Sequence, residues 1–188
     1  MLISIRMKKD LQRIIEIPEG VQVEINKNII VVKSGGKELI RDFDFGKVKV
    51  EKTEKELKLS VNGASRNESR MIGTIWAHLK NMLAGVGEDY VYKLEIANVH
   101  FPMSVKVDGA NKQVVIKSFL GEAADRFSKI VEGVKVEVNG ENIIVSSHDK
   151  EKAGQTAANL EKAARLTGRD RRIFQDGIYI TEKPGRVI

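Results

Sequence analysis

The chain has 188 residues, of which 41% are hydrophobic, 31% charged and 5% aromatic, and its 32 Lys and Arg against 26 Asp and Glu give a net charge of +6. This composition is typical of a globular protein and excludes a wholly disordered chain, and no run approaches the roughly 18 apolar residues of a membrane span. The absence of cysteine excludes disulfides, thiolate chemistry and cysteine-based zinc or iron–sulfur sites. Because the N-terminus lacks the apolar stretch of a secretory signal, we expect a soluble intracellular protein.

The elements predicted first along the chain are short strands followed by a helix. Alternating apolar and polar residues predict strands in VQVEI (21–25), NIIVVK (28–33), VKVEK (48–52) and LKLSV (57–61). A helix is expected from near Ser65, because Ser65 and Glu68 have the spacing of a capping box. Its apolar stripe, from Met71 to Leu83, predicts a core-facing helix, and Gly85 is expected to end it.

The second half repeats this order. Strands are predicted in YKLEIANV (92–99), SVKVD (104–108), QVVIK (113–117), VKVEV (134–138) and NIIVS (142–146). Asn139-Gly140 predicts a hairpin turn between the last two of these strands. A second helix is expected from about Asp149 to Thr167, with small apolar residues on one face and Gly168 as its C-cap.

An internal repeat relates the two halves. An offset of 84 residues places Pro18 on Pro102 and Lys33-Ser34 on Lys117-Ser118. The predicted fold class is therefore α+β, with two tandem duplicated domains, each a small, mostly antiparallel sheet packed with one main helix. The expected parts are an N-terminal repeat domain at 1–89, a C-terminal repeat domain at 90–176 and a C-terminal tail at 177–188.

The motifs of common enzyme and cofactor sites are absent. The three histidines, His78, His100 and His148, lie far apart and do not form a metal-ligand pattern. The run at 34–38, SGGKE, lacks the upstream glycine and the Ser or Thr of a phosphate-binding loop. Gly85-Val86-Gly87 lacks the third glycine of a dinucleotide fingerprint. We therefore expect no enzymatic activity, no cofactor and no metal.

The clearest chemical signal is a basic segment, residues 162–172, that straddles the predicted end of the second helix. Five basic residues stand against Asp170 alone: Lys162, Arg165, Arg169, Arg171 and Arg172. Guanidinium groups suit bidentate phosphate contacts, and a helix C-terminus favours nearby arginines, so we expect these to cap the helix and project outward. RNA contact is the interpretation we prefer, and a solvated, helix-capping run of charge is the alternative.

Aromatic residues follow this segment. Asp176-Gly177 predicts a turn and 178–180 a short strand, after which Lys183 and Arg186 extend the basic character. Phe174 and Tyr179 are suited to base stacking, but anchoring the tail to the domain is the role that we favour.

These features resemble the large-subunit ribosomal protein six family in its archaeal and eukaryotic form. The likeness spans roughly residues 14–182 and lies in the duplicated halves together with IPEGV (17–21), IVVKSGG (30–36), GT (73–74), NMLAGV (81–86), GQTAA (154–158) and DGIY (176–179). The bacterial form is expected to have a lysine- and glycine-rich stretch where this chain has RDRRIFQDG (169–177). No single motif decides the resemblance, which depends on their order and spacing.

The resemblance implies a non-catalytic structural constituent of the large ribosomal subunit, in the cytoplasm. Its expected partners are large-subunit rRNA near the sarcin–ricin loop, neighbouring ribosomal proteins and translational GTPases bound nearby, with no membrane. The second domain and its tail would contact the rRNA, and the first domain would face outward. The expected RNA-contacting residues are Gly154, Gln155, Asn159, Lys162, Arg165, Thr167, Gly168, Arg169, Arg171 and Arg172, with Lys183 and Arg186 of the tail.

A function outside the ribosome is the alternative. Two small strand-rich domains are also suited to a tandem protein-interaction module that presents exposed strand edges to partners. Such a module would be purified free of RNA and would bind an acidic protein instead.

Overall fold

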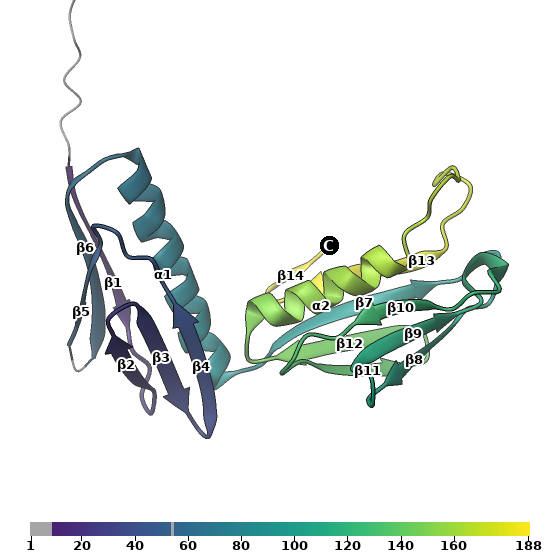
Figure 1. The fold of residues 1–188 in the computed structure, drawn as a ribbon, viewed down its shortest axis with the longest axis horizontal. Helices are drawn as coiled ribbons and strands as arrows, with labels where there is room; N and C mark the ends of the chain where they lie inside the picture. Colours follow the sequence, from purple (N-terminus) through teal and green to yellow (C-terminus); the bar gives the residue numbers. More distant parts are fainter. Residues whose placement is uncertain (1–8, 54) are drawn as a thin grey trace, which may run out of the picture. The chain divides into compact units, whose positions relative to one another are not determined.

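The computed structural model describes residues 9–53 and 55–188, and the chain forms two compact units that meet between Glu88 and Asp89 (Figure 1). Each unit has its own hydrophobic core, made of residues from that unit. No helix among the described residues combines the length and the apolar character needed to cross a membrane.

The first unit contains two antiparallel sheets and one helix. Its elements are β1 (Lys9–Glu16), β2 (Gln22–Asn26), β3 (Ile29–Ser34), β4 (Lys37–Asp42), β5 (Lys49–Lys52), β6 (Glu56–Ala64) and α1 (Arg66–Gly87). One sheet has the order β1-β6-β5 and the other the order β2-β3-β4. Ile30 of β3, Leu59 of β6 and Leu79 of α1 are fully buried, so both sheets and the helix share one core.

The predicted start of α1 is confirmed. Ser65 accepts a hydrogen bond from the backbone N–H of Asn67 at 3.2 Å, and its own N–H donates to the Glu68 carboxylate at 2.9 Å, which completes a capping box. Hydrogen bonds from the Ser65 hydroxyl and then from nearby backbone N–H groups lower the pKa of Glu68 to about 2. The helix ends at Gly87, two residues beyond the predicted end, and Gly85 is buried inside it.

The second unit also contains two antiparallel sheets and one main helix, but one of its sheets has five strands. Its elements are β7 (Tyr90–Ala97), β8 (Ser104–Asp108), β9 (Gln113–Lys117), a short 3₁₀ turn η1 (Phe119–Gly121), β10 (Arg126–Lys129), β11 (Lys135–Asn139), β12 (Asn142–Ser147), α2 (Lys150–Ala163), β13 (Gly177–Lys183) and β14 (Arg186–Val187). The antiparallel sheets have the orders β10-β9-β8 and β11-β12-β7-β13-β14. α2 lies across them and buries Leu160 beside Leu94 and Ile116 in one core (Figure 1).

The predicted class, α+β with tandem duplicated domains, is confirmed, but each unit has two sheets where one was expected. The residues expected to form a separate tail, 177–188, belong to the second unit instead. β13 pairs antiparallel with β7 and places Ile178 opposite Ile96. Ile178 is buried, because this pairing places its side chain beside that of Ile96 on the face of the sheet that packs against the core.

The strands that sequence patterning missed are at sheet edges: β1, β4, β10 and β14. β10, for example, has four residues, of which Ser128 alone is buried. The predicted hairpin between β11 and β12 is present. Its two loop residues are Gly140 and Glu141 rather than the predicted Asn139 and Gly140, because Asn139 pairs with Asn142. Gly140 has a positive φ of +62°.

Candidate nucleic-acid interface

The small-residue face of α2 brings the helix backbone close to β7. Ala153 and Ala157 are fully buried, and a Cβ on Gly154 would lie 3.0 Å from the Tyr92 hydroxyl oxygen. Gly154 therefore has a packing reason to be glycine, in addition to its predicted RNA contact. At the start of the helix, the Asp149 carboxylate accepts the N–H of the second helical residue at 2.9 Å.

α2 ends at Ala163, four residues before the predicted end at Thr167. The guanidinium of Arg126, on β10, donates to the carbonyls of Ala163 and Arg165 at 3.0 Å each. The same group donates to both carboxylate oxygens of Glu122, at 2.8 and 2.6 Å. The expectation that the downstream arginines cap the helix is therefore wrong, because Arg126 of strand β10 binds these carbonyls instead.

The segment after α2, residues 164–176, is called the arginine loop below. Leu166 is buried and fixes its beginning. Asp170 organises its middle, because its carboxylate accepts the N–H of Arg172 and its carbonyl accepts the N–H of Phe174, both at 2.9 Å. The Arg172 guanidinium also lies 2.8 Å from that carboxylate and lowers the pKa of Asp170. The Arg172 side chain is 89% exposed, so this ion pair adds little stability.

Four side chains in contact hold the end of the arginine loop to the segment after β7. The Arg169 guanidinium lies 4.8 Å from the ring centre of Phe174, and the rings of Phe174 and His100 are 4.9 Å apart. The Asp176 carboxylate lies 2.6 Å from His100 Nδ1 and accepts the His100 N–H at 2.9 Å. Phe174 therefore anchors the loop rather than standing free to stack on a base.

Asp176 is buried and ionised. Its side chain is 1% exposed, and burial by itself would raise the pKa of the carboxyl group. Hydrogen bonds from the backbone and the ring of His100 outweigh that effect, so the pKa is lowered. The predicted turn at Asp176-Gly177 is wrong, because Gly177 is the first residue of β13.

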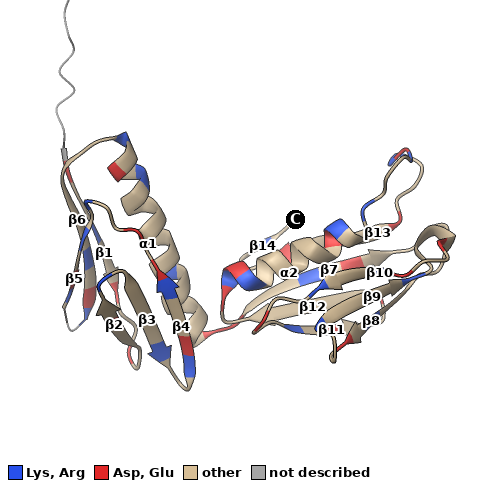
Figure 2. Ribbon diagram, in the orientation of Figure 1, with Lys and Arg blue, Asp and Glu red and all other residues tan. Residues whose placement is uncertain are grey.

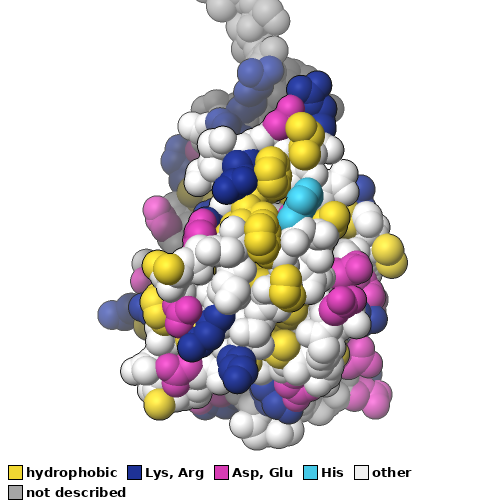
Figure 3. Space-filling view, turned by 90° about the vertical axis from the view of Figure 1, so that its right-hand side faces the viewer, with side chains coloured by type: hydrophobic (Ala, Val, Ile, Leu, Met, Phe, Trp, Pro, Cys, Tyr) yellow, Lys and Arg dark blue, Asp and Glu magenta, His cyan; other side chains and the backbone are white. Residues whose placement is uncertain are grey.

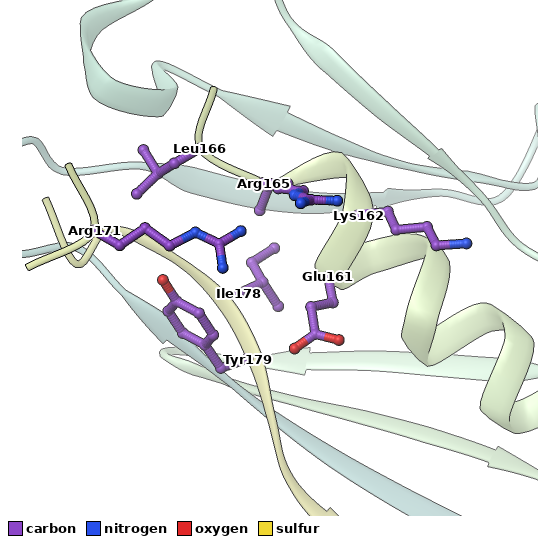
Figure 4. Close-up of a pocket in the computed structure, with 8 residues that line it drawn as sticks. Glu161, Lys162, Arg165, Leu166, Arg171, Ile178 and Tyr179 are labelled. Carbon is purple, nitrogen blue, oxygen red and sulfur yellow. The ribbon is translucent and has the colours of Figure 1, made fainter. Parts of the chain in front are cut away.

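A pocket lies between the end of α2 and the start of β13 (Figure 4). Its lining residues are Glu161, Lys162, Ala164, Arg165, Leu166, Arg171, Ile178 and Tyr179. Arg171 and Glu161 point into it from opposite sides, whereas Lys162 points away. Within the described part of the chain, the guanidiniums of Arg165 and Arg171 form no hydrogen bond or ion pair. The pocket thus brings three predicted RNA-contacting residues together, along with one carboxylate.

Two further predicted residues lie on the face of α2 that is turned toward β10. Gln155 Nε2 donates to Asn159 Oδ1 at 2.8 Å, so the two side chains share one face of the helix. Asn159 Nδ2 in turn donates to the Lys129 carbonyl at 3.2 Å, so this side chain also ties the helix to the sheet. Thr167 and Gly168 are exposed in the arginine loop, where Gly168 has a φ of +70° and lies beyond the helix end rather than capping it.

Lys183 and Arg186 lie away from the pocket. They pair with each other across the β13–β14 hairpin. Gly177 begins β13 and Lys183 ends it, so at about 3.3 Å per residue the two ends are roughly 20 Å apart. The predicted contacts therefore form an extended line along α2 and β13 rather than one compact site.

The surface around the arginine loop mixes charge with exposed apolar side chains. Figure 2 shows Lys and Arg interspersed with Asp and Glu on α2 and the loop. Figure 3 shows hydrophobic side chains gathered in a stripe with Lys and Arg around it. Val99, Phe101 and Ile173, from the segments joined by the His100–Asp176 contact, are exposed. No group of three His, Asp or Glu residues in the described ranges could hold a metal ion.

Comparison with known proteins agrees with this architecture. The family model of ribosomal protein L6 matches residues 17–89 and 101–177, one match in each unit. The chain belongs to the ribosomal protein L6 family. A large ribosomal subunit protein uL6 of Methanococcus vannielii is 47% identical over 93% of this chain and 94% of its own length. The uL6 proteins of Methanosarcina mazei and Desulfurococcus amylolyticus are 42% and 45% identical, over 94% and 90% of this chain and 99% and 92% of their own lengths.

Ribosomal protein L6 is a structural, non-enzymatic family. Sequence reasoning overlooked Arg126 and the His100–Asp176 contact that order the arginine loop. His100 and Asp176 are 76 residues apart in the chain, and Arg126 and Ala163 are 37 apart. Local spacing carries no signal for such contacts.

Proposed function

We propose that this member of the ribosomal protein L6 family is a structural constituent of the large ribosomal subunit in the cytoplasm, and that it binds large-subunit rRNA through the arginine loop and the adjoining face of α2. The observation that carries this proposal is the pair of guanidiniums, Arg165 and Arg171, that no carboxylate of the described chain neutralises. They stand on a loop whose backbone is fixed at both ends, so binding RNA orders their side chains without the added entropy cost of ordering the backbone.

The chemistry of the loop suits the phosphate backbone. A guanidinium donates two parallel hydrogen bonds to phosphate oxygens and keeps its charge at every physiological pH. The Arg169 guanidinium lies over the Phe174 ring, and a cation on an aromatic face can still donate hydrogen bonds to phosphate. Recognition is then mainly of RNA shape and backbone, as expected for a double-helical or compact RNA target.

The finer part of the proposal concerns location. The resemblance supports a site near the sarcin–ricin loop, close to bound translational GTPases and to neighbouring ribosomal proteins. Hydroxyl-radical footprinting of large subunits with and without the protein tests this directly. Protection confined to nucleotides remote from the sarcin–ricin loop would contradict the location while leaving rRNA binding intact.

The decisive experiment measures the salt dependence of binding to large-subunit rRNA. Replacing Arg165, Arg169, Arg171 and Arg172 by Gln removes four positive charges from the loop. Each lost phosphate contact is expected to lower the slope of log K against log salt by about 0.7–0.9. The matched control is Arg66→Gln with Arg70→Gln, on exposed positions of α1, which is expected to leave the slope unchanged.

An unchanged slope in the loop variant, with circular dichroism showing that it is folded, would refute RNA binding by the loop. The alternative function, a tandem protein-interaction module, would then be favoured. A purified sample that is free of RNA and sediments away from ribosomal particles would support that alternative.

A further inference from the structure

The sheet formed by β2, β3 and β4 has an outer face that the proposed function leaves unassigned. Strand register places its side chains in three rows across the sheet: Gln22–Lys33–Glu38, Glu24–Val31–Ile40 and Asn26–Ile29–Asp42. The alternate residues, such as Val23, Ile30 and Leu39, are buried in the core of the first unit. These nine outward residues are called the acidic face.

The acidic face has an apolar centre. Ile40 is 63% exposed and Ile29 is 42% exposed, and both flank Val31, which neighbouring side chains cover. The three aliphatic residues belong to two adjacent strands, so they form one continuous patch. Aliphatic area surrounded by charged residues marks an interaction surface more often than scattered exposed residues do.

Carboxylates surround this centre. Lys33 lies 3.8 Å from the Glu24 carboxylate and 3.3 Å from the Glu38 carboxylate, so it neutralises part of their charge. With Asp42, the acidic face carries three negative charges and one positive charge, a net −2, on a chain whose net charge is +6.

The equivalent face of the second unit, on β8, β9 and β10, has the opposite sign. Val115 and Phe127 stand opposite each other there as Val31 and Ile40 do in the first unit. The rows are Ser104–Lys117–Asp125, Lys106–Val115–Phe127 and Asp108–Gln113–Lys129, where Lys117 and Asp125 are joined by an ion pair of 3.4 Å. Three lysines against two aspartates give +1, so the duplicated surfaces differ by three charges.

We infer that the acidic face binds a Lys- and Arg-rich segment of a protein. Its charge repels the phosphate backbone of RNA, whereas it attracts basic side chains and orients their approach. Its apolar centre supplies the water-excluding contact that charge alone does not. The inference rests on the proposed function, because the partner is expected within the large ribosomal subunit. The first unit would then bind a positively charged protein segment and the second unit the negatively charged RNA.

The test uses large ribosomal subunits that contain the full chain with a benzophenone amino acid in place of Ile40. The matched control carries the same group at Phe127, which is 58% exposed at the equivalent position of the second unit. After irradiation, the product at position 40 is expected to be another ribosomal protein, with the site mapped by mass spectrometry to a Lys- and Arg-rich segment. A product at position 127 with a different partner would show that the two faces are distinct.

A second measurement uses the unmodified chain. A carbodiimide, which joins a carboxylate directly to an amine, is expected to link Glu24 or Asp42 to a lysine of that same segment. Crosslinking of position 40 to rRNA, to a segment without basic residues or to nothing overturns the inference. Co-sedimentation of the unmodified chain with large subunits tests the proposed function separately. A failure of the inference can therefore be distinguished from a failure of the proposed function.

Discussion

Asp176 is the single residue on which the geometry of the arginine loop depends most. Asp176 directly precedes β13, and its carboxylate binds the backbone and the ring of His100. The carboxylate is almost completely shielded from water. A buried carboxylate that satisfies two donors fixes both segments, and its removal leaves those donors unpaired. The arginines that we propose to contact RNA are therefore positioned by a side chain outside the proposed RNA-contacting set.

We predict that Asp176→Asn destabilises the second unit by about 1–3 kcal/mol, because asparagine keeps one acceptor oxygen but turns an NH2 donor toward the other donor of His100. In the parent protein, the pKa of Asp176 is lowered by folding, so its contribution is present above the ordinary pKa of 3.8 and is lost as the pH falls below it. Urea unfolding followed by tyrosine fluorescence reports this unit, since Tyr90, Tyr92 and Tyr179 all lie in it. Equal stability of parent and variant at pH 7 would contradict the prediction.

Among the secondary-structure elements, α2 shows how an end is set by a distant residue. Its spacing of small apolar residues continues to Ala164, yet the helix stops at Ala163 because Arg126 binds the carbonyls there.

We predict that Arg126→Ala destabilises the second unit by about 1–3 kcal/mol and increases hydrogen exchange in residues 160–166. Lys129→Ala, three residues along the same strand, is the control and is expected to change neither. Unaltered exchange in Arg126→Ala would show that the helix end is set otherwise.

The elements also show what the sequence could and could not reveal. The capping box at Ser65 and the β11–β12 hairpin were predictable, because each depends on residues within a few positions of one another. Strand β10 was not, because Phe127 faces solvent and Ser128 faces the core, which reverses the expected pattern. The arginines of the loop were found from composition, whereas the contacts that hold them needed the tertiary structure.

For the whole molecule, two separate cores imply two separate folding units. We predict that urea unfolding is biphasic or that its two transitions respond independently to mutation, because no core residue is shared. Trp76 is the chain's one tryptophan and reports the first unit, so its fluorescence is expected to be insensitive to Asp176→Asn. A shift of the Trp76 transition in that variant would show that the units unfold as one.

The place of β13 has a consequence for how the protein is made. β13 pairs with β7, the first strand of its unit, and so completes the middle of a sheet with residues that are synthesised long after β7. While those residues are still inside the exit tunnel, β7 has a vacant edge that a chaperone or another nascent chain can occupy. The first unit ends at Glu88, so it can fold before β13 is made, whereas the second unit is complete only after β13 has left the tunnel.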